Sequence, residues 1–178
     1  PTPSVTNPGS QYVCAGANTQ LLNFTGTGTT YQWSAANTTI GIGANGTNSI
    51  ASFIGQNATN SVASSQVTVT PIFTQGIACT GSNQVFTYYV LPIPSVAPIN
   101  NQSFCNQAVV PTTPINGSGT SYSWTNSNTA IGLVASGSNV INGFNASNSG
   151  TTSLLGNVNI TPIFTFQGQS CNGPLASY

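Results

Sequence analysis

No residue of this chain carries a charged side chain. Its 178 residues include no Lys, Arg, Asp, Glu or His, whereas about a quarter of the residues in an ordinary globular domain are charged. Ser, Thr, Asn and Gln occupy 80 of the 178 positions, and apolar residues make up 38%. The chain must therefore fold without ion pairs, around small apolar cores, beneath a polar and neutral surface.

The missing residue types exclude most kinds of chemistry. General acid–base catalysis relies on His, Asp, Glu or Lys, and an activated Ser or Cys nucleophile needs a neighbouring base. Zinc sites are built from Cys, His or carboxylates, and EF-hand-like calcium sites need carboxylates. Nucleic-acid binding relies on Lys and Arg. We therefore expect no enzyme, no cofactor and no nucleic-acid partner. No apolar run approaches the roughly 20 residues of a membrane span, and the first residues lack the basic and apolar regions of a signal peptide.

The sequence repeats itself after 91 residues. This shift places Cys14 on Cys105, and the run Thr-Pro-Ile-Phe-Thr at residues 70–74 on the same run at residues 161–165. One further residue in the second copy makes Cys79 correspond to Cys171. We therefore predict two homologous modules, at residues 1–91 and 92–178, joined by a short proline-containing linker.

Alternation of polar and apolar residues predicts β-strands throughout. The clearest examples are residues 66–70, 121–125 and 157–161, and the face made by Phe86, Tyr88 and Val90. Segments rich in Gly, Asn and Ser separate them and form turns. Several short strands in about 90 residues predict an all-β fold of two tandem immunoglobulin-like sandwiches. Pro71 and Pro162 interrupt strand patterns and are expected at an edge, at a bulge or at a strand end.

The four cysteines occur as one pair per module. Their matched positions favour the disulfides Cys14–Cys79 and Cys105–Cys171, each closing a loop of about 66 residues and stabilising its module by about 4 kcal/mol. The alternative is buried free thiols. A thiolate metal site is disfavoured because no C-x-x-C spacing occurs. Disulfides indicate an extracellular, oxidising location.

Each module also repeats a Tyr-x-Trp motif on one strand face. Tyr31 and Trp33 correspond to Tyr122 and Trp124. Repetition at the same module position favours core residues, with the tryptophan beside the disulfide as in immunoglobulin sandwiches. The alternative is an exposed aromatic platform for a sugar.

Together these motifs resemble the PKD-like tandem repeats of giant surface proteins in Bacteroidota-type bacteria. The resemblance covers nearly the whole chain and rests on Cys14, Tyr31, Trp33, Ile40, Gly41, Ile50, Phe53, Val67, Val69, Pro71, Cys79, Gly81, Pro92 and Pro94 and their counterparts in the second module. It implies immunoglobulin-like β-sandwiches, export to the cell surface and a role in a stalk or an adhesive fibre. It implies no catalytic residues.

Eight Asn-x-Ser/Thr sequons are candidate glycosylation sites. They lie at Asn23, Asn37, Asn45, Asn57, Asn101, Asn116, Asn145 and Asn159. Chance produces many such triplets in a chain this rich in Asn, Ser and Thr, so a glycan is only weakly indicated.

The leading functional hypothesis is a structural repeat segment of an extracellular adhesin stalk or filament, which associates with itself through neutral polar surfaces. A net charge of zero favours such association. The alternative is a secreted carbohydrate-binding module, which predicts that several of Tyr12, Tyr88, Tyr89 and Tyr178 lie exposed and coplanar around one groove. Ice binding by rows of Thr is disfavoured, because Thr68 corresponds to Asn159.

The second module is expected to lack most of its final strand. In the first module residues 85–90 form a good strand pattern after Cys79, whereas Tyr178 already corresponds to Phe86. An open sheet edge invites pairing with another strand. We expect that strand from the continuation of a longer repeat chain or from a neighbouring subunit, by β-strand addition.

Overall fold

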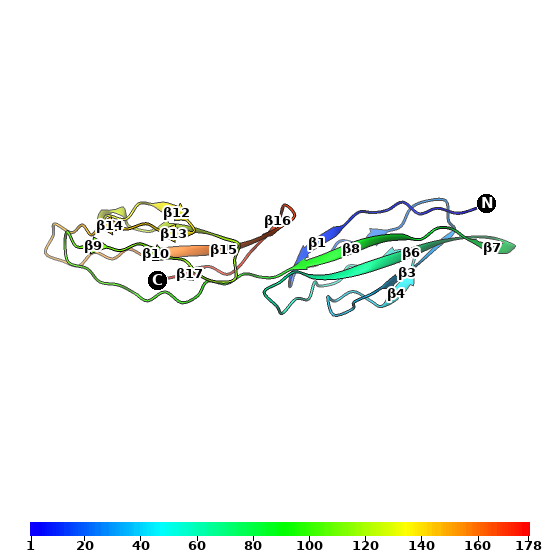
Figure 1. Cartoon of the computed structure of the whole chain (residues 1–178), viewed down its shortest axis with the longest axis horizontal. Coiled ribbons are helices and arrows are strands. Elements are labelled where there is room, and N and C mark those ends of the chain that lie inside the picture. The colour runs from blue at the N-terminus through cyan, green and yellow to red at the C-terminus, as the bar shows by residue number, and fades with distance from the viewer. The chain divides into compact units, whose positions relative to one another are not determined.

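The computed structural model describes the whole chain, Pro1–Tyr178, and is all-β. The one helical element is a single 3-10 turn, η1 (Thr129–Ile131). The chain divides into two compact units, Pro1–Pro92 and Ile93–Tyr178 (Figure 1). The division falls one residue after the boundary expected from the repeat.

The first unit contains eight strands. They are β1 (Gln11–Cys14), β2 (Leu22–Asn23), β3 (Thr30–Ala35), β4 (Asn45–Thr47), β5 (Ser49–Ile50), β6 (Ala63–Gln75), β7 (Ile77–Thr80) and β8 (Gln84–Leu91). The main sheet has the order β1-β8-β6-β3-β4, with β7 paired to β6 beyond the end of β8, and β2 pairs separately with β5. All pairs are antiparallel except β1 with β8, which is parallel.

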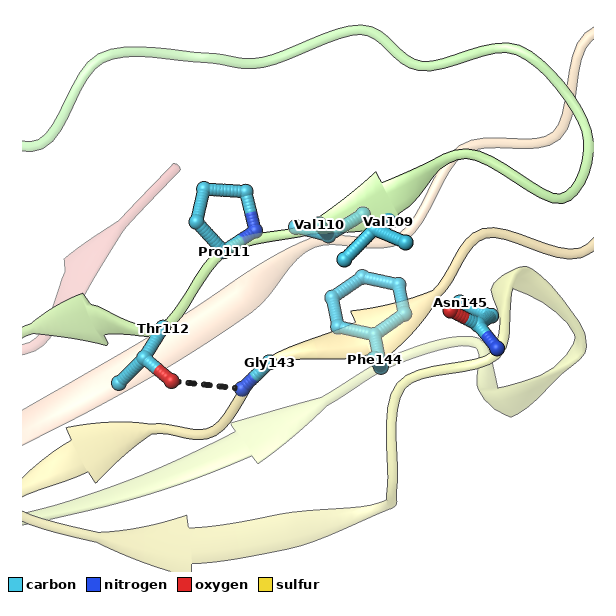
Figure 2. Close-up of a pocket in the computed structure, with 7 residues that line it drawn as sticks. All are labelled: Val109, Val110, Pro111, Thr112, Gly143, Phe144 and Asn145. Carbon is cyan, nitrogen blue, oxygen red and sulfur yellow. Dashed lines mark hydrogen bonds between the residues drawn. The ribbon is translucent and has the colours of Figure 1, made fainter.

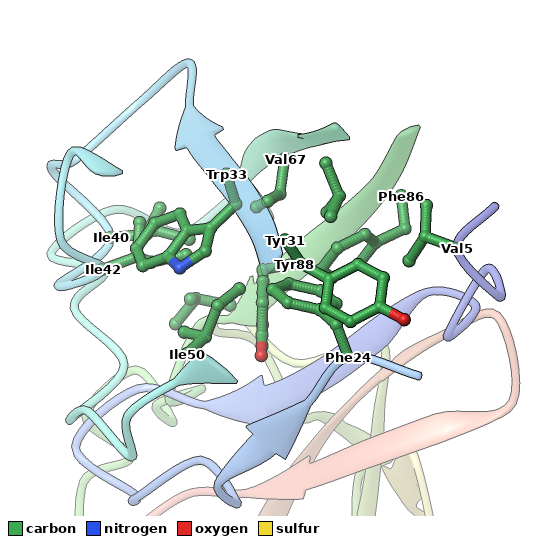
Figure 3. Packing of buried hydrophobic residues seen from close by; sticks show 12 residues of the cluster. Val5, Phe24, Tyr31, Trp33, Ile40, Ile42, Ile50, Val67, Phe86 and Tyr88 are labelled. Carbon is green, nitrogen blue, oxygen red and sulfur yellow. The ribbon is translucent and has the colours of Figure 1, made fainter. Parts of the chain in front are cut away.

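The first core lies on one face of this main sheet. Alternate residues of β6 and β8 point inward, among them Val67, Val69, Phe86 and Tyr88, because successive strand residues face opposite sides. Figure 3 shows Trp33 beside the isoleucines of the opposite layer, and the aromatic side chains gathered next to them. Ile50 on β5 belongs to this cluster, so the β2–β5 ladder helps to cover the sheet. This arrangement is consistent with a β-sandwich.

The second unit repeats the antiparallel pairs of the first on nine strands, without a counterpart of the parallel β1–β8 pair. They are β9 (Val109–Val110), β10 (Thr113–Pro114), β11 (Ser121–Asn126), β12 (Ser136–Ser138), β13 (Val140–Ile141), β14 (Phe144–Asn145), β15 (Val158–Phe166), β16 (Gln169–Asn172) and β17 (Ala176–Ser177). The main sheet has the order β12-β11-β15-β16, with β17 also paired to β15. Tyr122 pairs with Pro162 as Tyr31 pairs with Pro71, so the two units share one register.

The two strand prolines mark a change of partner rather than the end of a strand. Pro71 lies within β6, between the residues that pair with β8 and those that pair with β7. Its missing N–H therefore faces a gap in the ladder, while its carbonyl oxygen accepts a hydrogen bond from Gly81 N (2.9 Å). Pro162 occupies the same gap in β15, with Gly173 N as the donor (2.9 Å).

Candidate functional site

The predicted disulfide Cys14–Cys79 is wrong, because the two residues lie at opposite ends of the first unit. Cys14 pairs with Leu91 of β8, and the preceding residue of β8, Val90, pairs with Ala63 at the start of β6. Cys79 pairs with Phe73, near the other end of β6. The ten residues between these points of β6 span about 33 Å at about 3.3 Å per residue. A disulfide needs Cα atoms within about 7 Å, and Cys79 is a free thiol.

The predicted disulfide Cys105–Cys171 is wrong for the same reason. Cys105 lies in a turn whose Gln107 N donates to Ala146 O, next to β14 (2.7 Å). Cys171 lies on β16, which Figure 1 places at the other end of this unit from β9 and β14. Cys105 is an exposed free thiol.

Cys14 and Cys171 are disulfide-bonded in the structure. Each unit thus contains one oxidised cysteine and one free thiol, although the repeat places all four cysteines at matched positions. A disulfide is compatible with an oxidising compartment.

The Tyr-x-Trp residues lie in the two cores, where the strand pattern predicts them. Trp33 and Trp124 are 7% and 2% exposed, and their tyrosine partners are similarly buried. Each indole Nε1 donates to a backbone oxygen across the core, at Ser49 (2.9 Å) and Val140 (3.0 Å). The sequence predicts a disulfide beside each tryptophan. Trp33 instead covers Gly46, where an added Cβ would lie 2.8 Å from the indole ring.

A recurring asparagine that sequence reasoning missed holds each tyrosine strand in place. Asn48 adopts φ 65°, a left-handed conformation that Asn tolerates better than most residues. Its Oδ1 accepts from Tyr31 N (3.0 Å), and its own N–H donates to Tyr31 O (2.7 Å). Asn139 makes the same two bonds with Tyr122. The sequence contains a sign of this role, because each repeat has an Asn at the equivalent position between two short strands.

The four tyrosines of the carbohydrate hypothesis do not form one platform. Tyr88 is 2% exposed and packs against Phe53, while Tyr178 packs on the core of the other unit. Burial raises the pKa of Tyr88 to about 12 and also raises that of Tyr178. Tyr12 and Tyr89, on adjacent strands, stack on each other with ring centroids 5.2 Å apart. Only this half-buried pair remains as a candidate sugar contact.

The candidate glycosylation sites differ in accessibility. Five of the eight asparagines are exposed, at Asn23, Asn45, Asn101, Asn116 and Asn145. Asn37 and Asn57 are partly buried and use their side-chain amides to hold neighbouring segments, through bonds to Ser64 O and to Val90 O. Asn159 is also partly buried and bonds Ser177 on β17. An N-linked glycan would be attached to Nδ2, the atom that donates these bonds at Asn37 and Asn57, whereas the Asn159 bond is accepted by Oδ1.

The hollows of the surface include two shallow ones. One of about 410 Å³ lies between β9 and β14 (Figure 2), and one of about 540 Å³ lies beside Gly55 and Asn57 in the first unit. No titratable side chain lines either hollow. The chain has no group of three or more potential metal ligands, and none of its helical structure is long and apolar enough to cross a bilayer.

Comparison with protein-family models and with curated proteins gives no match to this chain. The resemblance to PKD-like repeats therefore rests on the residues quoted for it above.

Proposed function

We propose that this chain is a structural segment of an extracellular adhesin stalk or filament, built from PKD-like, immunoglobulin-like modules and without enzymatic activity. The observation that carries the proposal is the complete absence of charged side chains from a repeated all-β chain. Copies of such a chain neither repel one another nor depend on salt-screened ion pairs when they pack side by side.

Three further observations support this role. The loops are held by side-chain amides and hydroxyls rather than by charges, as at Asn37, whose amide donates to Ser64 O while its Oδ1 accepts from Thr39. The hollows are shallow and lack the convergent polar and titratable groups typical of small-molecule sites. The disulfide-bonded cysteines fit an extracellular location.

Electron microscopy of native material tests the proposal directly. We expect regular fibres or stalks that contain this chain. Isolated particles with no continuous assembly would contradict it.

A charge-insertion variant tests the physical argument. Four exposed residues become Lys in one variant and Gln in a matched control, at Thr2, Ser82, Thr151 and Ser153. Light scattering should show that the parent and the Gln control associate equally from low salt to about 1 M NaCl. The Lys variant should associate only when salt screens its charges. Equal association of the Lys variant at low salt would refute a role for neutrality.

A further inference from the structure

Strand β8 differs from the other long strands of the chain in its composition. The two strands that exceed it in length, β6 and β15, each contain a proline, Pro71 and Pro162. The eight residues of β8 include neither proline nor glycine, and six of them are aromatic or β-branched. Uncharged segments with this composition are typical of cross-β assemblies, in which copies of one strand stack on one another.

No charged residue protects β8 against such stacking. Natural sequences commonly place charged residues or prolines beside strands of this kind, and these gatekeepers prevent pairing between molecules. Pro92 follows β8 directly, but residues 81–83, which precede the strand, are Gly, Ser and Asn. The chain has no charged side chain anywhere. The shielding of β8 must therefore come mainly from the fold.

The fold covers one edge of β8 along almost its whole length. Seven residues, Gln84–Val90, pair antiparallel with β6. The side chains of Phe86, Tyr88 and Val90 on the inner face are at most 4% exposed, and Figure 3 shows the first two within the core. This edge and this face are therefore inaccessible to a second molecule while the first unit is folded.

The other edge of β8 has a smaller cover. Strand β1 pairs with it through four residues, at Tyr88–Leu91, and Ala15 N donates to Leu91 O just beyond this ladder (2.9 Å). On the first half of the strand, the side-chain amide of Asn7 donates to Val85 O (3.2 Å). Val85 is itself 46% exposed. A ladder of four residue pairs thus covers this edge, against seven residue pairs on the β6 side.

Release of β1 is therefore the smaller step that opens β8. Hydrogen-bonded residue pairs alternate along an antiparallel ladder, so the backbone groups of Val85, Thr87, Tyr89 and Leu91 face the β1 side. The bonds to Val85 O and Leu91 O agree with this alternation. Loss of β1 would expose this row of N–H and C=O groups while β8 stays paired with β6. Such an edge pairs readily with another strand.

We propose that β8 is a cross-β segment that β1 keeps covered. Its partner is the β8 strand of a second copy of this chain, and further copies add to the stack in register. The assembly begins when β1 leaves its edge, and it is completed when β8 also separates from β6. It is distinct from the packing of folded copies proposed above and does not depend on it.

Both faces of the released strand suit such a stack. Phe86, Tyr88 and Val90 share one face, because successive strand residues point to opposite sides, and this face can form a dry interface between two sheets. The opposite face carries one further aromatic and two further β-branched side chains. In an in-register stack each side chain lies about 4.8 Å from its copies in the neighbouring layers. A charged residue would therefore meet a like charge in every layer, and β8 has none.

The first test uses an acetylated and amidated peptide with the sequence of residues 84–91. It should form fibres whose diffraction shows the spacings between strands and between sheets, at about 4.7 Å and about 10 Å. A control peptide carries Thr87→Pro, which removes a backbone N–H from the stack. It should stay soluble at a concentration at least about tenfold higher. Fibres from both peptides alike, or from neither, would overturn the proposal.

The second test uses the full chain, with its disulfide intact and its free thiols Cys79 and Cys105 alkylated. Fragments of the peptide fibres are added as seeds in urea just below the unfolding midpoint, and thioflavin T fluorescence follows the growth of fibres. Two variants at one exposed position, Val85→Lys and Val85→Gln, are similar in length and differ in charge, and melting shows that both fold. At low salt the Lys variant should grow at least about tenfold more slowly than the Gln variant, and about 1 M NaCl should remove most of this difference. Equal growth of the two variants at low salt would overturn the proposal.

Hydrogen exchange tests the role of β1 in the native chain and the identity of the stacked strand in the fibres. In the native chain the amides of Tyr89 and Leu91, which face β1, should exchange at least about tenfold faster than those of Phe86 and Val90, which face β6. Equal exchange would mean that β1 opens only with the whole unit, and it would overturn β1 as the cover. In the fibres residues 84–91 should be protected. Protection of another strand, with these residues unprotected, would overturn the proposal as a whole.

Discussion

Alkaline pH should destabilise the first unit through one buried phenol. Tyr88 is 2% exposed, and its ring lies between those of Phe53 and Phe86. The phenolate is poorly solvated in this apolar site, so burial raises the pKa of Tyr88 to about 12 from its ordinary value of 10.

The direction and size of the effect follow from proton linkage. Below about pH 10 the phenol is protonated in both the folded and the unfolded chain, so it adds no pH dependence. Above about pH 10 the unfolded chain loses the proton while the folded chain keeps it, and the free energy of unfolding falls. The fall ends near about pH 12 and totals about 2.7 kcal/mol, at about 1.36 kcal/mol per pH unit.

The matched variant Tyr88→Phe isolates this contribution. Urea unfolding of both proteins at several pH values, with the methyl signals of the buried Val67, Val69 and Val90 as the probe of the first unit, gives the difference between their free energies of unfolding. The other phenols and the thiols cancel in this difference. It should be constant up to about pH 9 and then move by about 2.7 kcal/mol against the parent by about pH 12. A difference that stays constant within about 0.5 kcal/mol over this range would refute the argument from burial.

Three further outcomes are expected. Melting temperatures should stay nearly constant from about pH 4 to about pH 7 and up to about 1 M NaCl, because the chain has no Asp, Glu, His, Lys or Arg and no ion pair to be screened; a shift of tens of degrees would contradict this. Gly81→Ala should destabilise the first unit by about 1–3 kcal/mol in urea unfolding, because the new Cβ would lie 1.8 Å from Pro3 O. The control Gly43→Ala meets nothing closer than 3.6 Å and should cost less than about 1 kcal/mol. Mass spectrometry after alkylation should find Cys79 and Cys105 labelled without reduction, and the other two cysteines labelled only after it.

Several features of the fold follow from the sequence because they are encoded locally. Period-2 alternation identifies strands such as β6, β11 and β15, because successive strand residues face opposite sides. The same alternation assigns Trp33 and Trp124 to the cores. The shift of 91 residues locates the division between the units, and it predicts that Tyr178 occupies the place of Phe86.

Other features depend on which distant residues meet, and only the tertiary structure decides them. Equal spacing in the repeat pairs Cys14 with Cys79, but the parallel pairing of β1 with β8 puts these residues about 33 Å apart along β6. The place of Pro71 at a change of strand partner depends likewise on where β8 ends and β7 begins.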